Sequence, residues 1–273
     1  MKKVLVAFDG SNFSDGAFEF ASQMNKSQPI LLTGAFLPQT EYANLWSYAN
    51  AIEPVFVPLV EADEADAIEM NIARFESKCK EAKIEYKVHS NFWDFALPEL
   101  RRETRYTDLL IIGSETFYSN MSRAEVNLYL QDALHDAECP VIVVPEDFSY
   151  PESNILAYDG TASSVFAIKQ FSYLFPEFTK NPTTLTYATH EETKKFPEHA
   201  NMQELIAANF KDLSLLNLEL DLKKYFAVWM SEKKATILVC GSFGRSGLSR
   251  MLKTSFIADV IADHKVPVFI THK

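Results

Sequence analysis

The chain has 273 residues, of which 47% are hydrophobic and 23% are charged, and its formal net charge is −11. This composition is typical of a globular protein long enough for two domains of ordinary size. No apolar run approaches the roughly 20 residues that a membrane-spanning helix needs. The N-terminal apolar run is also shorter than the roughly 7–15 residues of a signal-peptide core. We therefore expect a cytoplasmic protein that does not associate with membranes.

The charge is unevenly distributed along the chain. Residues 1–150 contain 12 basic and 24 acidic side chains, whereas residues 151–273 contain 14 basic and 13 acidic ones. Non-specific binding to nucleic acid requires a basic surface, so the sequence predicts no nucleic-acid partner. A bound polyanion would be repelled by the first half and tolerated by the second.

Cysteine and histidine spacing predicts neither a disulfide framework nor a metal site. The three cysteines, Cys79, Cys139 and Cys240, form no CxxC pair and are odd in number. The six histidines show no HExxH or comparable spacing. We interpret the cysteines as reduced thiols that pack as small apolar groups.

Three segments of the first half return in the same order in the second half, which indicates an internal repeat. They are residues 3–11, 108–114 and 139–144, which return as residues 154–161, 235–242 and 266–271. The sequence therefore predicts two copies of one unit, in domains spanning 1–148 and 149–273. A polar, proline-containing segment at 145–154 joins them.

Both copies alternate short apolar runs with amphipathic helical patterns. In the first copy we expect strands at 3–8, 30–36, 84–90, 108–113 and 141–145, and helices at 14–26, 59–82, 93–104 and 123–137. In the second we expect strands at 154–158, 183–189, 214–220, 236–241 and 266–271, and helices at 162–174, 198–210, 222–233 and 255–264. This alternation predicts an α/β fold: two tandem Rossmann-like or flavodoxin-like domains, each a mostly parallel five-stranded sheet with helices on both faces.

The first copy is longer than the second, and most of the excess lies in an aromatic-rich segment at 38–62. Two interpretations remain open for this segment. It is either a surface insertion that packs on its own domain or an arm that covers a pocket or a neighbouring subunit.

A glycine-rich loop follows the apolar run 236–241. It contains Gly241, Gly244 and Gly247, and an amphipathic helix begins close to Ser255. A strand, a glycine-rich loop and a helix N-terminus form the arrangement that receives phosphate, because glycine permits close approach and the helix dipole favours an anion.

These residues together resemble the tandem, two-domain form of the universal stress protein family. The resemblance covers essentially the whole chain and rests on four features. They are the aspartates Asp9 and Asp159 after the first strand of each copy, the Gly-Ser pairs at 113–114 and 241–242, the Pro-Val strands at 140–141 and 267–268, and the glycine-rich loop. Nucleotide-binding members of the family carry Gly, two residues, Gly, nine residues, Gly, and then Ser or Thr. Here Thr254 stands in place of the third glycine and Ser255 takes the hydroxyl position.

The resemblance implies an adenine-nucleotide site in the second copy. It assigns Asp159 to the adenosine part and the backbone of Ala188 to adenine. The remaining implied positions belong to the phosphate loop and the start of its helix: Gly241, Gly244, Arg245, Lys253, Ser255 and Phe256. Structural alternatives exist, since Asp159 could cap the following loop or helix, Ala188 could be an ordinary strand residue, and loop cations are commonly solvated.

The first copy departs further from the pattern. Thr116 stands at the second glycine position, and either Val126 or Asn127 stands at the third, depending on the register. Glu115 and Glu125 add negative charge where phosphates would lie. We therefore expect this copy to have lost nucleotide binding.

The resemblance implies a stress-response regulatory protein with one site for ATP or a related adenine nucleotide, with Mg²⁺ accompanying ATP. No catalytic residues are expected, so any ATP hydrolysis would be slow. One alternative is an interaction protein that has lost nucleotide binding, and another is an enzyme that uses a different small ligand in the same cleft. In this family single units pair through their last strands, and the tandem chain is expected to make that pair internally. A homodimer and a protein partner both remain open.

Overall fold

The computed structural model describes residues 1–38, 62–90, 96–119, 126–188, 197–218, 222–241 and 256–271. Most of the predicted insertion at 38–62 lies outside these ranges, as do residues 242–255 of the glycine-rich loop.

The helices and strands follow the predicted order in both halves. The first half contains β1 (Lys2–Asp9), α1 (Asp15–Ser27), β2 (Ile30–Leu37), α2 (Ala62–Glu81), β3 (Glu85–Ser90), α3 (Ala96–Thr104), β4 (Leu109–Gly113), α4 (Leu128–Asp136) and β5 (Val141–Val144). The second half contains β6 (Ser153–Tyr158), α5 (Ala162–Leu174), the 3₁₀-helix η2 (Phe178–Lys180), β7 (Thr183–Ala188), α6 (His199–Asn209), β8 (Leu213–Leu218), α7 (Leu222–Ser231), β9 (Thr236–Gly241), α9 (Phe256–Ala262) and β10 (Val268–Thr271).

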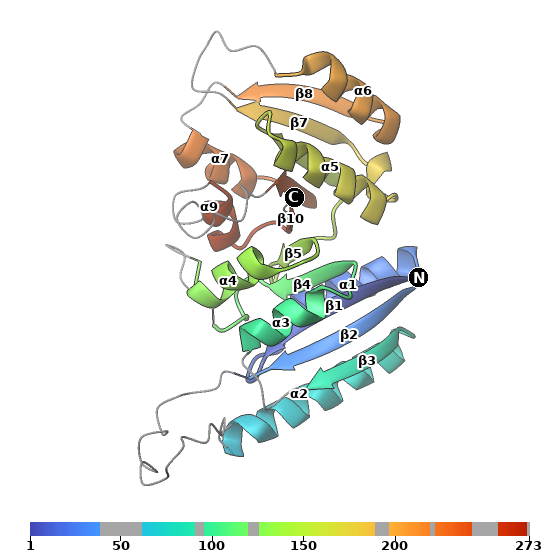
Figure 1. Cartoon of the computed structure of the whole chain (residues 1–273), viewed down its shortest axis with the longest axis vertical. Helices are drawn as coiled ribbons and strands as arrows, with labels where there is room; N and C mark the ends of the chain where they lie inside the picture. Colours follow the sequence, from blue (N-terminus) through green and yellow to red (C-terminus); the bar gives the residue numbers. More distant parts are fainter. Residues whose placement is uncertain are drawn as a thin grey trace, which may run out of the picture.

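All ten strands belong to one sheet, which runs the length of the molecule in the order β3-β2-β1-β4-β5-β10-β9-β6-β7-β8 (Figure 1). Within each half the neighbouring strands are parallel. The halves join where β5 and β10 pair antiparallel. The predicted α/β fold is therefore confirmed, as is the internal pairing through the last strand of each copy.

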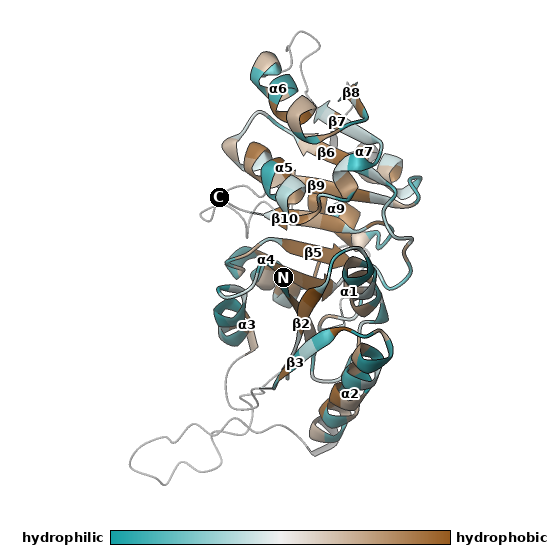
Figure 2. Ribbon diagram, turned by 90° about the vertical axis from the view of Figure 1, so that its right-hand side faces the viewer, coloured by the Kyte–Doolittle hydropathy of each residue, from teal (hydrophilic) through white to brown (hydrophobic). Residues whose placement is uncertain are grey.

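Helices cover both faces of the sheet, as expected for parallel strands. The apolar side chains of α1, α2, α5 and α6 pack against one face. Those of α3, α4, α7 and α9 pack against the other. Figure 2 shows the central strands in brown between helices that carry hydrophilic surface. Among the described residues, no helix is both long and apolar enough to span a membrane.

Side-chain caps determine where several helices begin. Ser14, Asn127 and Thr161 each accept the backbone N–H three residues further on, at 3.0, 2.7 and 3.3 Å respectively. Such a bond satisfies one of the four N–H groups that a helix leaves unpaired at its start. The cap explains why α4 begins at Leu128 rather than at residue 123 as the sequence predicted, because Asn127 has extended backbone geometry.

The junction between the halves is apolar on both faces. Every residue of β5 is buried, and Val268 and Phe269 of β10 have no exposed surface. The Phe269 ring packs edge-on against Phe171 and Phe175 of the second half, with centroids 5.4 and 6.1 Å apart. Phe20 from α1 reaches the same cluster at 6.4 Å from Phe175. The two halves thus share one aromatic cluster as well as one sheet.

Replacing Phe269 with alanine should destabilise the whole chain. Truncating a buried Phe costs about 3–5 kcal/mol, from lost burial and from the cavity left behind. The Phe269 ring belongs to the aromatic cluster that both halves share. The urea midpoints of unfolding measured by tryptophan fluorescence and by far-UV circular dichroism should therefore decrease together. The exposed Tyr173→Ala variant is the control and should change stability by less than about 0.5 kcal/mol. A Phe269→Ala variant that unfolds in two separate transitions, with the first half unaffected, would contradict a shared core.

Candidate functional site

The predicted site lies at the ends of β6 and β9. These strands are parallel neighbours, with Leu156 opposite Val239, so their carboxyl ends meet at one edge of the sheet. The strand that follows β6 in the chain, β7, lies on its other side. Ligands of open α/β sheets bind at such a point, where the order of the strands reverses. The structure brings together here Asp159, which follows β6, Gly241, which ends β9, and the backbone of Ala188, which ends β7.

Asp159 is exposed and organises the turn into α5. Its Oδ1 accepts the backbone N–H of Thr161 at 2.9 Å and the Thr161 hydroxyl at 2.7 Å. Gly160 between them has a φ of +84°, a conformation that glycine adopts without strain. Asp159 therefore caps the loop before α5, while Thr161 caps the helix itself. Within the described residues both hydrogen bonds to Asp159 use Oδ1. No other described residue makes a hydrogen bond to Oδ2.

Gly241 allows α5 to approach the end of β9 closely. A Cβ added at this position would lie 2.4 Å from the carbonyl carbon of Ser163 and 2.5 Å from the nitrogen of Ser164. Gly113 has the same role in the first half, where an added Cβ would lie 2.4 Å from Ser14 Oγ. Both glycines are thus required by helix packing, independently of any ligand.

The other predicted ligand positions lie outside the described residues or are described only by their backbone. Gly244, Arg245, Lys253 and Ser255 fall in the first group, together with Thr254. Ala188 and Phe256 fall in the second, as the last residue of β7 and the first of α9.

The corresponding crevice of the first half is filled by the protein's own groups. Asp9 is 4% exposed and accepts the Tyr118 backbone N–H at 2.7 Å. It also accepts the Ser11 N–H at 3.0 Å and two bonds from Asn12, at 2.5 and 2.8 Å. Burial raises the pKa of the Asp9 carboxyl above its ordinary 3.8, although these hydrogen bonds oppose the shift.

Tyr118 lies across the ends of the strands in this half. Its hydroxyl donates to the carbonyl of Leu37, the last residue of β2, at 2.6 Å. Its ring stacks on Tyr129 with centroids 4.2 Å apart. The amide of Asn127 holds the turn in place by donating to the carbonyls of Phe117 and Tyr118, at 3.0 Å each. The degenerate loop thus forms a plug over the crevice.

A carboxylate occupies the helix N-terminus beside this plug. Glu146, just after β5, accepts the Gly16 N–H at 3.0 Å, the Thr116 hydroxyl at 3.1 Å and the Ser14 hydroxyl. A helix N-terminus favours an anion. Here the chain supplies the anion itself. The first turn of α5, in the second half, contains no acidic residue, and the position after β10 that corresponds to Glu146 lies outside the described residues.

The second half also contributes to closing the first-half crevice. His264, which follows α9, makes a hydrogen bond of 2.8 Å between its Nδ1 and the Ser114 hydroxyl. Ser114 is 1% exposed, and its hydroxyl also donates to Glu115. These buried contacts link the two halves and are inaccessible to a substrate.

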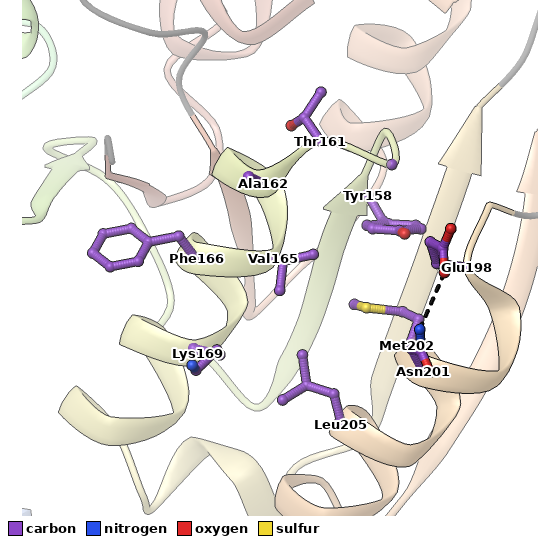
Figure 3. A pocket seen from close by; sticks show the side chains of 11 residues that line it. Tyr158, Thr161, Ala162, Val165, Phe166, Lys169, Glu198, Asn201, Met202 and Leu205 are labelled. Carbon is purple, nitrogen blue, oxygen red and sulfur yellow. Dashed lines mark hydrogen bonds between the residues drawn. The ribbon is translucent and has the colours of Figure 1, made fainter.

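A groove of about 440 Å³ lies between α5 and α6, beside the Asp159 turn (Figure 3). Val165 of α5 faces Met202 and Leu205 of α6, and the ring of Tyr158 lies next to Glu198 at one end. The volume falls within the range of about 300–1,000 Å³ that is usual for small-molecule pockets.

The equivalent space between α1 and α2 in the first half is packed with side chains. The rings of Phe13 and Phe18 have centroids 6.2 Å apart, and Phe18 contacts Phe75 edge-on at 6.1 Å. The Arg74 guanidinium lies 4.5 Å from the centre of the Phe13 ring. Among the described residues, the second half therefore has a groove next to its aspartate, whereas aromatic rings and Arg74 fill the equivalent space in the first half.

The described residues offer no metal site or accessible thiol. They contain no group of three or more histidine, cysteine, aspartate or glutamate side chains able to hold a metal ion. All three cysteines are free and buried. Burial raises the pKa of the Cys139 thiol to about 11 and that of Cys79 to about 12.

Sequence reasoning did not find Tyr118 or Glu146. Their contacts with Asp9 and Gly16 span more than a hundred residues, and neither belongs to a recognisable motif. The sequence offered two signals at this position, Thr116 in place of the second glycine and the acidic side chains near the first Gly-Ser pair. Both predict that this half has lost nucleotide binding, which stays a prediction.

The fold and the strand-end crevices define a doubly wound α/β protein with two tandem units. A universal stress protein from Archaeoglobus fulgidus DSM 4304 has a similar structure, with a TM-score of 0.73, 16% identity, and coverage of 100% of this chain and 96% of that one. A candidate universal stress protein from Pseudomonas aeruginosa UCBPP-PA14 gives a TM-score of 0.57 at 12% identity, covering 100% and 93%. A functionally unknown protein from Pseudomonas aeruginosa PAO1 gives 0.59 at 11% identity, covering 100% and 92%. The chain thus has the universal stress protein fold over its full length, as the sequence motifs predicted.

No protein-family model matches the sequence, and neither does any curated protein. At these levels of identity the structural similarity establishes the fold alone.

Replacing Tyr118 with phenylalanine should weaken the first half. The change leaves the buried Leu37 carbonyl without this partner, which costs about 0.5–1.5 kcal/mol. Urea unfolding of the variant and of an exposed control, Tyr173→Phe, provides the comparison. Equal stabilities for the two variants would contradict the claim that the Tyr118 hydrogen bond stabilises the first half.

Asp9 should make the stability depend on pH. Because its folded pKa lies above 3.8, the folded state binds the proton more tightly than the unfolded state. The stability of the wild type relative to Asp9→Asn should therefore fall as pH rises from below 3.8 through the folded pKa, and then level off. Urea unfolding of both proteins across this range measures the difference, and a relative stability that increased with pH would contradict the assignment.

Proposed function

We propose that this protein is a stress-response regulatory protein that binds one adenine nucleotide, ATP or a relative, in the crevice at the ends of β6 and β9. The observation that carries the proposal is the contrast between the two halves. In the first half the aspartate is buried under Tyr118, and Glu146 takes the helix N-terminus. In the second half Asp159 is exposed, with one carboxylate oxygen available and a groove beside it.

Electrostatics favour the same half. Residues 1–150 contain twice as many acidic as basic side chains, whereas residues 151–273 are nearly balanced. A nucleotide carries several negative charges, so its approach to the second half meets less repulsion. The likeness to a universal stress protein over the whole chain supports the regulatory role.

In this proposal each part of the site has a separate task. Asp159 would accept hydrogen bonds from the ribose hydroxyls, and the backbone of Ala188 would meet the base. Gly244, Arg245, Lys253 and Ser255 would surround the phosphates, with Mg²⁺ carried in by the nucleotide. We assign no general base, so hydrolysis should be slow and binding itself should be the signal.

Calorimetric titration of ATP, with and without Mg²⁺, tests this proposal. The wild type should bind one equivalent, and Asp159→Asn should bind about tenfold or more weakly, because a hydrogen bond to a charged group contributes about 1.5–3 kcal/mol. The counterpart variant Asp9→Asn should leave the affinity unchanged. An absence of heat and of thermal stabilisation for the wild type at millimolar ATP would refute the proposal.

A second candidate is an interaction protein that binds no nucleotide, and the acidic first half favours it. The exposed face of α2 carries acidic side chains such as Asp66 and Glu69. A basic protein partner would bind less well to a double charge-reversal variant, Asp66→Lys with Glu69→Lys, in an affinity capture. Unchanged capture by that variant, together with ATP binding by the wild type, would exclude this candidate.

A further inference from the structure

The ten-stranded sheet ends in two edge strands, β3 and β8, at opposite ends of the molecule (Figure 1). An edge strand presents a row of backbone N–H and C=O groups that no neighbouring strand satisfies. Such an edge pairs with another chain unless the sequence prevents it, for example by placing charged side chains along the strand.

The two edges differ in sequence. Residues 85–90 of β3 read Glu-Tyr-Lys-Val-His-Ser, with a charged or ionisable side chain at every second position. The 20-residue helix α2 packs against this strand. Residues 213–218 of β8 read Leu-Ser-Leu-Leu-Asn-Leu and contain no charge. The helix that follows β7, α6, has only 11 residues.

The backbone pairing shows which groups of β8 point outward. The strand lies parallel to β7, with Leu213 opposite Thr183 and Leu215 opposite Leu185. The N–H of Thr183 donates to the carbonyl of Asp212 at 2.8 Å. In a parallel pair with this register, the peptide groups of alternate residues bond to the neighbour. The backbone N–H and C=O groups of Leu213, Leu215 and Asn217 therefore face away from β7, toward the open edge of the sheet.

The side chains on this edge are also accessible. Leu215 is 44% exposed, and Ser214 and Asn217 are exposed as well. The strand thus combines outward backbone groups, apolar side chains and an absence of charge, which is the combination that favours strand pairing.

We propose that β8 is a docking edge for the β8 strand of a second copy of this chain, paired antiparallel about a twofold axis. The two identical, uncharged strands would bring no like charges opposite one another. The molecule already joins its own halves in this way, since β5 and β10 are short apolar strands that pair antiparallel. The result would be one continuous sheet of two chains.

The charge distribution favours a second copy as the occupant. The dimer would bring together the nearly neutral second halves, which carry 14 basic and 13 acidic residues each. The acidic first halves would lie at the far ends, because β3 is at the opposite end of each sheet. A pairing through β3 would instead bring together the strongly acidic halves.

Light scattering coupled to size-exclusion chromatography tests the proposal on the full-length chain from low to high micromolar concentration. The wild type should show a mass of two chains that falls toward one on dilution. Leu215→Lys, which places a charge on the edge, should remain at one chain throughout. Glu85→Lys, which changes a charge on the other edge, should dimerise like the wild type.

Hydrogen exchange of the wild type locates the interface without any substitution. When the protein concentration is raised, the backbone amides of Leu213, Leu215 and Asn217 should gain protection from exchange. The protection of the β3 amides should not change. A mass of one chain at every concentration overturns the proposal. A dimer that leaves these three amides unprotected overturns it too, whatever the stability of the variants.

Discussion

The antiparallel pairing of β5 with β10 is the constraint on which the rest of the structure depends. Each half is a parallel unit whose last strand is short and apolar and would otherwise be an open edge. When the two strands pair, neither remains an open edge. The pairing also buries Phe269 among aromatic rings of the second half, and Phe20 of the first half contacts the same rings. Because the pair is antiparallel, the strands of the two halves run in opposite directions. Their carboxyl ends, and therefore their crevices, lie at opposite edges of the sheet.

This separation allows the two crevices to differ. The first is closed by a plug, in which Tyr118 bonds to Leu37 and the backbone of the same residue bonds to Asp9. Glu146 supplies the anion that its helix N-terminus favours. The second keeps an exposed aspartate and an adjoining groove. The described side chains of the first half thus fill the position at which the second half has an exposed aspartate.

Much of the fold could be predicted from the sequence because it depends on local patterns. The strands and main helices could be placed within a few residues from the apolar runs, the helical periodicity and the repeated Asp-Gly and Gly-Ser pairs. The Pro-Val segments indicated the junction. The limits of α4 could not be predicted, because periodicity does not reveal that Asn127 is a cap. The site was predictable in part. Asp159 and Gly241 do lie at the carboxyl ends of neighbouring strands. The plug could not be foreseen, since it depends on contacts between residues 9 and 118 and between residues 16 and 146.

The junction also has a consequence for synthesis on the ribosome. The first half is complete once β5 has emerged, at residue 144, but its partner strand begins only at residue 268. At about 5–20 residues per second, the apolar β5 edge of the nascent chain would wait roughly 6–25 s for β10. Throughout that interval it could pair with the same edge of a neighbouring nascent chain on a polysome. Chaperone dependence of this protein should therefore be greatest during elongation of the second half, before the last strand completes the sheet.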